Sequence, residues 1–377
     1  MRLTVGAVLD QVVAEGLAAP RSIERAREVL EALEGAVDTT PPWYARVIAG
    51  FGAWMATAFL IGFLVVSDVV GNAADAMKLG PILVAAAVLL RRSAKLDAEF
   101  TRQLALAVSF AGQALLIVGV GTETKSWSTA ARVTLVMSVA LIPLVPDQAH
   151  RFMSALIGSL AAFWAMGDLT HVGRLGRLVV GGPDVAALAM VAVIAYVWRA
   201  DLRGRSPDLA EMLRPVGYGT VVGLFGLLLF SSLFAAAAMN LFATARPGPR
   251  QFGPATAVGI TAALVALQVA ISKEQRPRPH AEALVVAILA SLVLCWLTLW
   301  TPGVVAAVAA LALGFDRRDR VLVGLAIAFL VKFASVYYYS LQMTLLAKSM
   351  VLVAGGLVLL AARGYLRLRF GSTEATA

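Results

Sequence analysis

The sequence predicts an all-α protein, a polytopic integral membrane helical bundle of about 12 spans (between about 10 and 13) that follows a short N-terminal amphipathic helical hairpin. Two observations predict this class. Continuous apolar runs of about 18 or more residues, the length that a helix needs to cross a bilayer, recur along most of the chain. Charged residues make up 15% of the 377 positions, whereas a soluble protein carries about 25%.

Residues 1–38 differ from the rest because their apolar positions recur at helical spacing among many charged ones. Pro20 suits the first turn of a second helix and Gly35 suits its end, which predicts a cytoplasmic helical hairpin. The hairpin is either a docking module for a partner or the membrane surface, or a cap on the protein's own loops. The cap is the simpler interpretation, because charged helical faces are usually just solvated. Residues 39–45 form a linker.

Residues 46–366 are predicted to form the transmembrane helical domain, and residues 367–377 a cytoplasmic tail. The second and tenth apolar segments are short, since a run such as 302–315 reaches only about 20 Å of the roughly 30 Å hydrocarbon core. Each is either lengthened by less apolar flanks or is a partial span. The predicted segments are 46–67, 77–91, 103–121, 128–146, 151–168, 182–199, 216–244, 254–272, 281–300, 302–315, 320–340 and 344–363.

The basic residues are distributed unevenly between the two sets of loops. With the N-terminus in the cytoplasm, 23 of the 32 lysines and arginines fall on the cytoplasmic side, eight fall on the other side, and Lys332 lies within a span. Basic loops stay in the cytoplasm, so both termini are predicted there and the number of spans is even. These loops also account for the net charge of +9, so the lipid bilayer is the expected partner and nucleic acid is not.

Motifs for catalysis, metals and cofactors are missing from the chain. The histidines, His150, His171 and His280, are far apart, and none has the spacing of a zinc protease. Neither a phosphate-binding G-x-x-x-x-G-K-[ST] loop nor a G-x-S-x-G nucleophile turn occurs. Cys295 has no second cysteine to pair with and suits a buried apolar position. We therefore expect no catalytic residue, no cofactor, no metal and no enzymatic activity.

Small and amide residues within the spans predict contacts between helices. Gly219 and Gly223 have G-x-x-x-G spacing, which favours close helix packing inside the molecule over dimerisation. Gln113 and Gln268 lie within spans, where an amide usually bonds a neighbouring helix.

A candidate polar site lies in the predicted outer leaflet, near three consecutive tyrosines at 337–339 that suit a membrane interface. Lys332, Ser335 and Tyr339 share one helical face, and Lys348 opens the next segment at a similar depth. We expect Lys332 to point into the bundle toward Asp168, at the outer end of the fifth span. The alternative is that the lysines are anchors that extend their amines to the interface.

Two blocks near the ends of the spanning region carry a family resemblance. They read "PPWYARVIAGFGAWMATAFLIGFL" and "DRRDRVLVGLAIAFLVKFASVYYYSLQMTLLAKSMVLVAGGLVLLAAR". Together they resemble the bacterial membrane family of domain of unknown function 4401. The resemblance implies a bacterial inner-membrane location and a smaller membrane-anchored partner with an extracytoplasmic domain that is named for a Gly-Asp-Tyr pattern. It assigns no activity, but it adds weight to Tyr337–Tyr339, Lys348 and Ser349.

Two functions fit these observations. The first is a non-catalytic membrane subunit or scaffold that acts with a partner protein, which the absence of motifs and the family association favour. The second is a transporter or channel for a small, anionic solute, which the many spans and Lys332 favour. Acidic residues are missing deep within the spans, which argues against a proton- or sodium-coupled relay.

The predicted topology can be tested with reporter fusions. Fusions after Lys95 and after Arg369 should both report a cytoplasmic location, and a fusion at Met343 should report the opposite side, because of the uneven charge distribution. Termini on opposite sides of the membrane would contradict an even number of spans.

Overall fold

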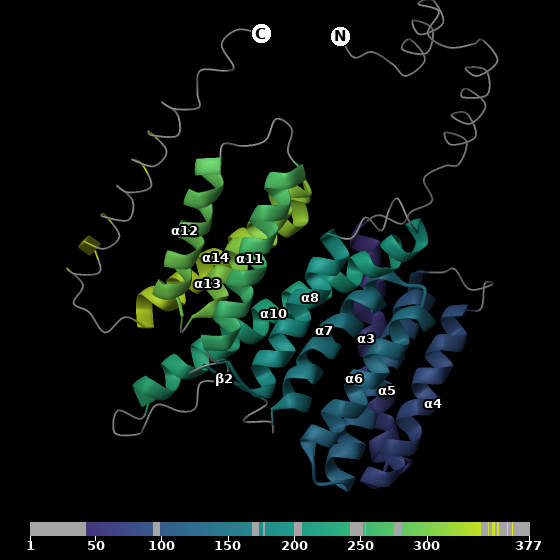
Figure 1. Ribbon diagram of the computed structural model, residues 1–377. Helices are drawn as coiled ribbons and strands as arrows, with labels where there is room; N and C mark the ends of the chain where they lie inside the picture. The colour runs from purple at the N-terminus through teal and green to yellow at the C-terminus, as the bar shows by residue number, and fades with distance from the viewer. Residues whose placement is uncertain are drawn as a thin grey trace, which may run out of the picture.

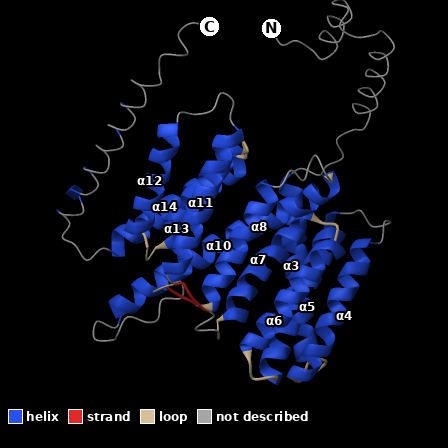
Figure 2. Ribbon diagram, in the orientation of Figure 1, coloured by secondary structure: helices blue, strands red, loops and turns tan. Residues whose placement is uncertain are grey.

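The computed structural model describes residues 43–92, 99–167, 173–175, 178–199, 206–241, 252, 254–274, 281–299, 301–340 and six single residues after 345. The predicted N-terminal hairpin, the last predicted span as a segment and the cytoplasmic tail lie outside the described residues. Within them the chain forms eleven helices and one small strand pair (Figure 2).

Each of the first eleven predicted apolar segments coincides with a helix, and the predicted bounds of the sixth and eleventh segments are those of α8 and α14. The helices are α3 (Trp43–Val66), α4 (Ala73–Arg92), α5 (Glu99–Glu123), α6 (Trp127–Leu144), α7 (Gln148–Met166), α8 (Gly182–Arg199), α10 (Pro207–Leu241), α11 (Pro254–Glu274), α12 (Ala281–Leu297), α13 (Pro302–Asp316) and α14 (Arg320–Ser340).

A short antiparallel hairpin lies between α7 and α8 and was not expected from the sequence. Strand β1 (Gly173–Leu175) pairs with β2 (Leu178–Val180), with Gly173 opposite Val180. It is too short to change the helical class of the fold.

Six of the described helices are long and apolar enough to cross a membrane, judged by length and composition. They are α4, the part of α5 from Phe100, α6, α8, the stretch Asp208–Leu233 of α10, and α11. The second predicted segment, expected to be short, gains its length from less apolar flanks and forms the 20 residues of α4. The tenth stays short as the 15 residues of α13, which reach about 22 Å.

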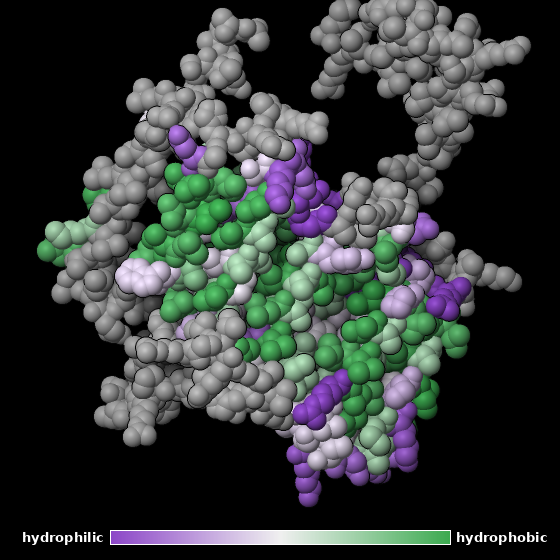
Figure 3. All heavy atoms as spheres, in the orientation of Figure 1, coloured by the Kyte–Doolittle hydropathy of each residue, from purple (hydrophilic) through white to green (hydrophobic). Residues whose placement is uncertain are grey.

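The helices pack side by side, with α3–α6 on one side, α11–α14 on the other, and α7, α8 and α10 between them (Figure 1). Figure 3 shows hydrophobic residues over the middle of the helices and hydrophilic residues toward their two ends. This distribution is the one that a bilayer requires of a spanning bundle, because its core offers charged groups no solvation.

Glycines set the closest helix crossings. A Cβ atom on Gly223 would lie 2.6 Å from the Cβ of Ser159 on α7, and one on Gly219 would overlap the carbonyl oxygen of Phe152. The prediction that these two glycines serve internal packing is therefore confirmed. A second crossing, not predicted, joins α4 to α5, where a Cβ on Gly112 would lie 2.6 Å from the carbonyl oxygen of Gly80.

The largest buried cluster joins α8, α10, α11, α13 and α14. At its centre the Phe225 ring lies 4.9 Å from that of Phe329 and 6.1 Å from that of Phe333. Cys295 is buried, as predicted. Gln268 donates to the Ser291 hydroxyl of α12 at 2.8 Å, which confirms the expected amide bond between neighbouring helices.

Replacing Gly223 with valine should lower the free energy of unfolding by about 1–3 kcal/mol, because the added methyl groups have no space against Ser159. Unfolding of the purified protein in mild detergent measures the change. Gly226→Val is the matched control on the same helix, since no atom lies within 4 Å of a Cβ built on Gly226. If the control lost as much stability as the Gly223 variant, close packing would not be the cause.

Candidate functional site

The most extensively bonded acidic side chain in the described residues is that of Asp319, in the turn between α13 and α14. One carboxylate oxygen accepts the backbone N–H groups of Val321 (3.2 Å) and Leu322 (3.1 Å), so Asp319 caps the N-terminus of α14. The other oxygen accepts Tyr218 (2.6 Å) and Arg214 (3.2 Å), both on α10.

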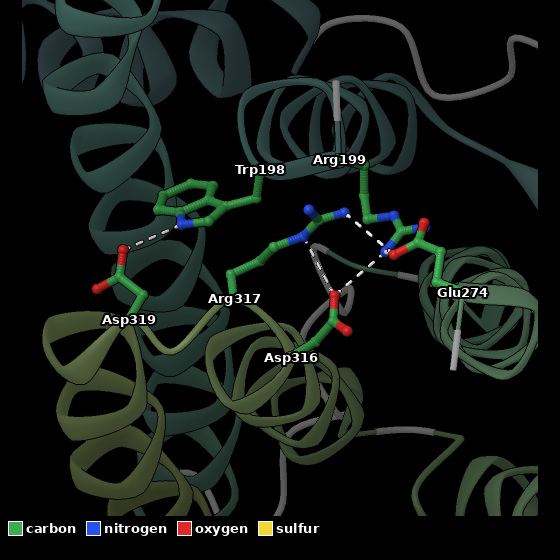
Figure 4. A network of polar contacts seen from close by, with 6 residues as sticks. All are labelled: Trp198, Arg199, Glu274, Asp316, Arg317 and Asp319. Carbon is green, nitrogen blue, oxygen red and sulfur yellow. Dashed lines mark hydrogen bonds and ion pairs between the residues drawn. The ribbon is translucent and has the colours of Figure 1, made fainter. Parts of the chain in front are cut away.

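The same oxygen of Asp319 also accepts the indole N–H of Trp198, at the end of α8, at 3.2 Å (Figure 4). Asp319 is 5% exposed and thus joins three helices from a buried position. Burial raises its pKa, but the hydrogen bonds from Tyr218, Leu322, Trp198 and Arg214 outweigh burial and hold the pKa below its ordinary value.

A neutral ion-pair cluster lies beside Asp319 and joins the ends of α8, α11 and α13 (Figure 4). The two terminal nitrogens of Arg199 donate to the carboxylate of Glu274, and one also donates to Asp316 at 3.1 Å. Arg317 lies 3.1 Å from Asp316 and 3.8 Å from Glu274. Two guanidinium groups and two carboxylates therefore balance, and each carboxylate already accepts donors. We call these four residues, with Trp198, Arg214, Tyr218 and Asp319, the loop-side network.

A second polar cluster lies at the N-terminus of α7, with Asp147 as its capping residue. Asp147 accepts the backbone N–H of His150 at 3.0 Å and lies within 3.6 Å of Arg91 and 3.4 Å of Arg102. It repeats the arrangement of Asp319: a buried carboxylate caps one helix and holds arginines from others.

His150 itself is 2% exposed and hydrogen-bonds the Ser109 hydroxyl of α5 (2.9 Å) and the Ser154 hydroxyl of α7 (3.1 Å). The cavity beside the serine–histidine pair measures about 10 Å³, which is too small for a substrate. A cavity of that size holds at most one water molecule. The pair therefore serves packing between α5 and α7.

An open cleft of about 840 Å³ separates the N-terminal parts of α7 and α10. Its polar walls include Arg214 and Tyr218, which link it directly to Asp319. We call it the loop-side cleft; its lining residues are Gln148, Ala149, Phe152, Ala210, Glu211, Arg214, Pro215 and Tyr218.

Basic loops that the charge count assigns to the cytoplasm are neighbours in the structure. Arg92, the last residue of α4, donates to the carbonyl oxygen of Leu144, the last residue of α6, at 3.1 Å. Arg199 and Arg317 both pair with Glu274. The polar clusters and the cleft therefore lie at one end of the bundle, where these loops gather.

Lys332 and Ser335 lie on one face of α14, as the spacing predicts, but the face is exposed. Another side of α14 buries Leu322, Ala326 and Phe333 in the core. The expected contact of Lys332 with Asp168 stays a prediction, because Asp168 lies outside the described residues. An exposed lysine near the end of a span is the arrangement of an anchor that reaches the interface.

The structure describes only part of the rest of the predicted outer-leaflet site. Ser335 donates to the carbonyl oxygen of Val331 on its own helix at 2.8 Å. Tyr339 belongs to the last turn of α14, while Asp168 and Lys348 lie outside the described residues. A meeting of these five residues stays a prediction.

The capping aspartates are the site residues that the sequence analysis does not predict. In "DRRDR", the aspartate directly before an apolar helical run is a signal for an N-cap that the sequence analysis does not use. The contacts of Asp319 with α8 and α10, more than 100 positions away, leave no local signal. In the described parts of the chain, no three His, Cys, Asp or Glu side chains could hold a metal ion.

A family model for a domain of unknown function (DUF4401) matches residues 42–369. The chain belongs to this family. The match covers all the described helices and begins after the predicted N-terminal hairpin. Searches of curated proteins and of solved structures each found no match. The family assignment therefore supports the sequence resemblance and carries no activity with it.

Replacing Asp319 with asparagine should lower the free energy of unfolding by about 1.5–3 kcal/mol, because an amide has one acceptor oxygen and cannot both cap α14 and accept from the side chains of α8 and α10. Thermal unfolding in detergent measures this. Asp208→Asn is the control, since Asp208 is exposed in the first turn of α10. Equal stability of the Asp319 variant and the wild type would contradict a joining role for the network.

Proposed function

We propose that the protein is a non-catalytic membrane subunit or scaffold that binds a segment of a partner protein in the loop-side cleft. The observation that carries this proposal is the cleft itself, which is wide, open and walled by a mixture of apolar and polar side chains beside a rigid network. Interfaces between proteins have this mixed character.

Backbone chemistry in the cleft favours a polypeptide occupant. Pro215 lies within α10 and has no N–H group to donate to the carbonyl oxygen of Glu211, one turn earlier. The Glu211 side chain is exposed at the same place. A carbonyl oxygen and a carboxylate together suit the N–H groups and basic side chains of a peptide segment.

The chemistry of the network also favours a scaffold. Each of its carboxylates accepts hydrogen bonds or ion pairs from arginine, tyrosine or tryptophan, and so none is left as a general base. An acid–base catalyst needs a group that can exchange its proton within reach of a substrate.

The proposal also includes the membrane in which the protein lies and the orientation of its termini. We place the protein in the bacterial inner membrane with about 12 spans, both termini and the N-terminal hairpin in the cytoplasm, and the partner anchored beside it. The clustering of Arg92, Arg199 and Arg317 at one end of the bundle supports this orientation. The family resemblance supports a membrane-anchored partner that has an extracytoplasmic domain. The cytoplasmic end of that partner would reach the cleft.

The competing function is transport of a small anionic solute. The many apolar helices support it, but the larger internal cavity between the helices is apolar, which suits hydrocarbon better than an anion. An anion would find one charged partner along its lining, Arg199, which is already paired with Glu274 and Asp316.

Co-purification tests the proposal. The tagged full-length protein, solubilised from its native membranes in mild detergent, should retain one partner in a fixed ratio. Glu211→Lys should reduce that recovery by about tenfold, because it places a positive charge beside Arg214 in the cleft. Asp208→Lys, one turn earlier and outside the cleft, is the matched control and should leave recovery unchanged.

Two results would contradict the proposal. One is a protein that purifies alone and, in liposomes, accumulates phosphate or chloride. The other is equal loss of the partner in the Glu211 and Asp208 variants, which would show that the cleft has no special part in binding.

A further inference from the structure

An apolar cavity of about 350 Å³ lies inside the bundle, between α8, α10, α11 and α13. It is separate from the loop-side cleft and shares no lining residue with it. Its inner wall is fully buried and includes Val221, Leu224 and Phe225 of α10 and Ala310 of α13. Arg199 is the charged residue among those that line it.

Alanines create the space. Ala263, Ala266 and Ala270 of α11 recur at helical spacing along one face, and Ala306 and Ala309 of α13 lie across from them. Small residues normally let helices approach closely, as Gly223 does against α7. Here the four helices stay apart, and a volume remains that the chain's own side chains do not fill.

The cavity opens sideways within the membrane. Ala266 is exposed, although the inner wall opposite it is buried. It lies eight residues before Glu274, at the end of α11, which is about 12 Å along the helix axis. Since α11 is long and apolar enough to span a bilayer, the opening faces the hydrocarbon region and not water.

Size and polarity select a hydrocarbon occupant. Water is unfavourable in a space whose walls are aliphatic and aromatic, since a buried water needs two or more polar partners. An apolar cavity of about 150 Å³ holds a benzene molecule, so about 350 Å³ holds on the order of a dozen carbon atoms. Ligand pockets of this size are common in proteins.

The charges at the end of the cavity indicate the kind of head group. Arg199 lines the cavity and belongs to the ion-pair cluster with Glu274, Asp316 and Arg317, whose charges sum to zero. A cluster with both signs complements a head group that also carries both signs, more than one with a net negative charge.

We propose that this cavity binds one acyl chain of a zwitterionic phospholipid, which enters from the bilayer past Ala266 and places its phosphate and ammonium groups at the ion-pair cluster. The lipid is a constituent of the folded bundle and fills the space that the alanines leave. This site does not depend on the partner protein proposed above.

Photolabelling tests the proposal on the full-length protein. The protein is reconstituted in phosphatidylethanolamine vesicles that contain a trace of phosphatidylethanolamine with a photoreactive group near the end of one acyl chain, and labelled peptides are identified by mass spectrometry. Label should appear on the buried wall, at 221–225 of α10 and 306–313 of α13. Ala266→Phe should reduce that label by about tenfold, because the ring closes the opening.

Ala262→Phe is the matched control, since Ala262 is exposed one turn earlier on α11 and does not line the cavity. It should leave labelling of the wall unchanged, and both variants should leave labelling of the exposed face of α12, at 285–293, unchanged. Ala309→Phe fills the cavity from the other side and should reproduce the loss in a protein that unfolds at or above the wild-type temperature.

Three results would overturn the proposal. The first is label confined to exposed faces such as that of α12. The second is wall label that is equal in the Ala266→Phe protein and the wild type. The third is wall label from photoreactive palmitic acid with none from the photoreactive phospholipid, which would assign the cavity to free fatty acid.

Discussion

The bundle depends on buried aspartates that begin helices and bind side chains from other helices. Asp319 begins α14 and binds α8 and α10, while Asp147 begins α7 and pairs with arginines of α4 and α5. Asp184, in the first turn of α8, accepts the hydroxyl of Thr256 on α11 and the backbone N–H of Gly181. Each carboxylate satisfies N–H groups that the first helical turn leaves without partners, and the positive end of the helix dipole favours its charge. A buried carboxylate without such partners would be strongly destabilising.

The lipid environment explains why the contacts of these aspartates are important for helix packing. Helices in a bilayer gain little from hiding apolar surface from one another, because lipid tails are as apolar as leucine. Their packing therefore depends on close fit and on polar contacts. Gly80, Gly112, Gly219 and Gly223 supply the close fit along the helices, and the aspartate joints supply polar contacts at their ends. Between α11 and α13, away from the ion pairs at their ends, alanines leave the apolar cavity.

The same physics decides how much could be predicted from the sequence. Hydropathy places the spanning segments well, because a bilayer sets their length and forbids charges, and the bounds of α8 and α14 match the predicted ones. It does not tell which face of a span packs inward, since both faces are apolar. The orientation of Lys332 toward Asp168 therefore stays a prediction, while the G-x-x-x-G pair is confirmed, because close packing needs a particular residue type and spacing. The partners of Asp319 join segments more than 100 residues apart and leave no local pattern.

The loop-side network lies between the two spaces of the bundle. Arg214 and Tyr218 face the cleft and bind Asp319, which also binds Trp198; the next residue, Arg199, lines the apolar cavity. An occupant of the cleft that draws Arg214 away would leave Asp319 with fewer donors, and its remaining contacts are at the end of α8. Energetic coupling between two sites requires an element that both occupants contact and that has two arrangements. The end of α8 is where the contacts from the two spaces converge, so a coupling between partner and lipid would have to pass through it.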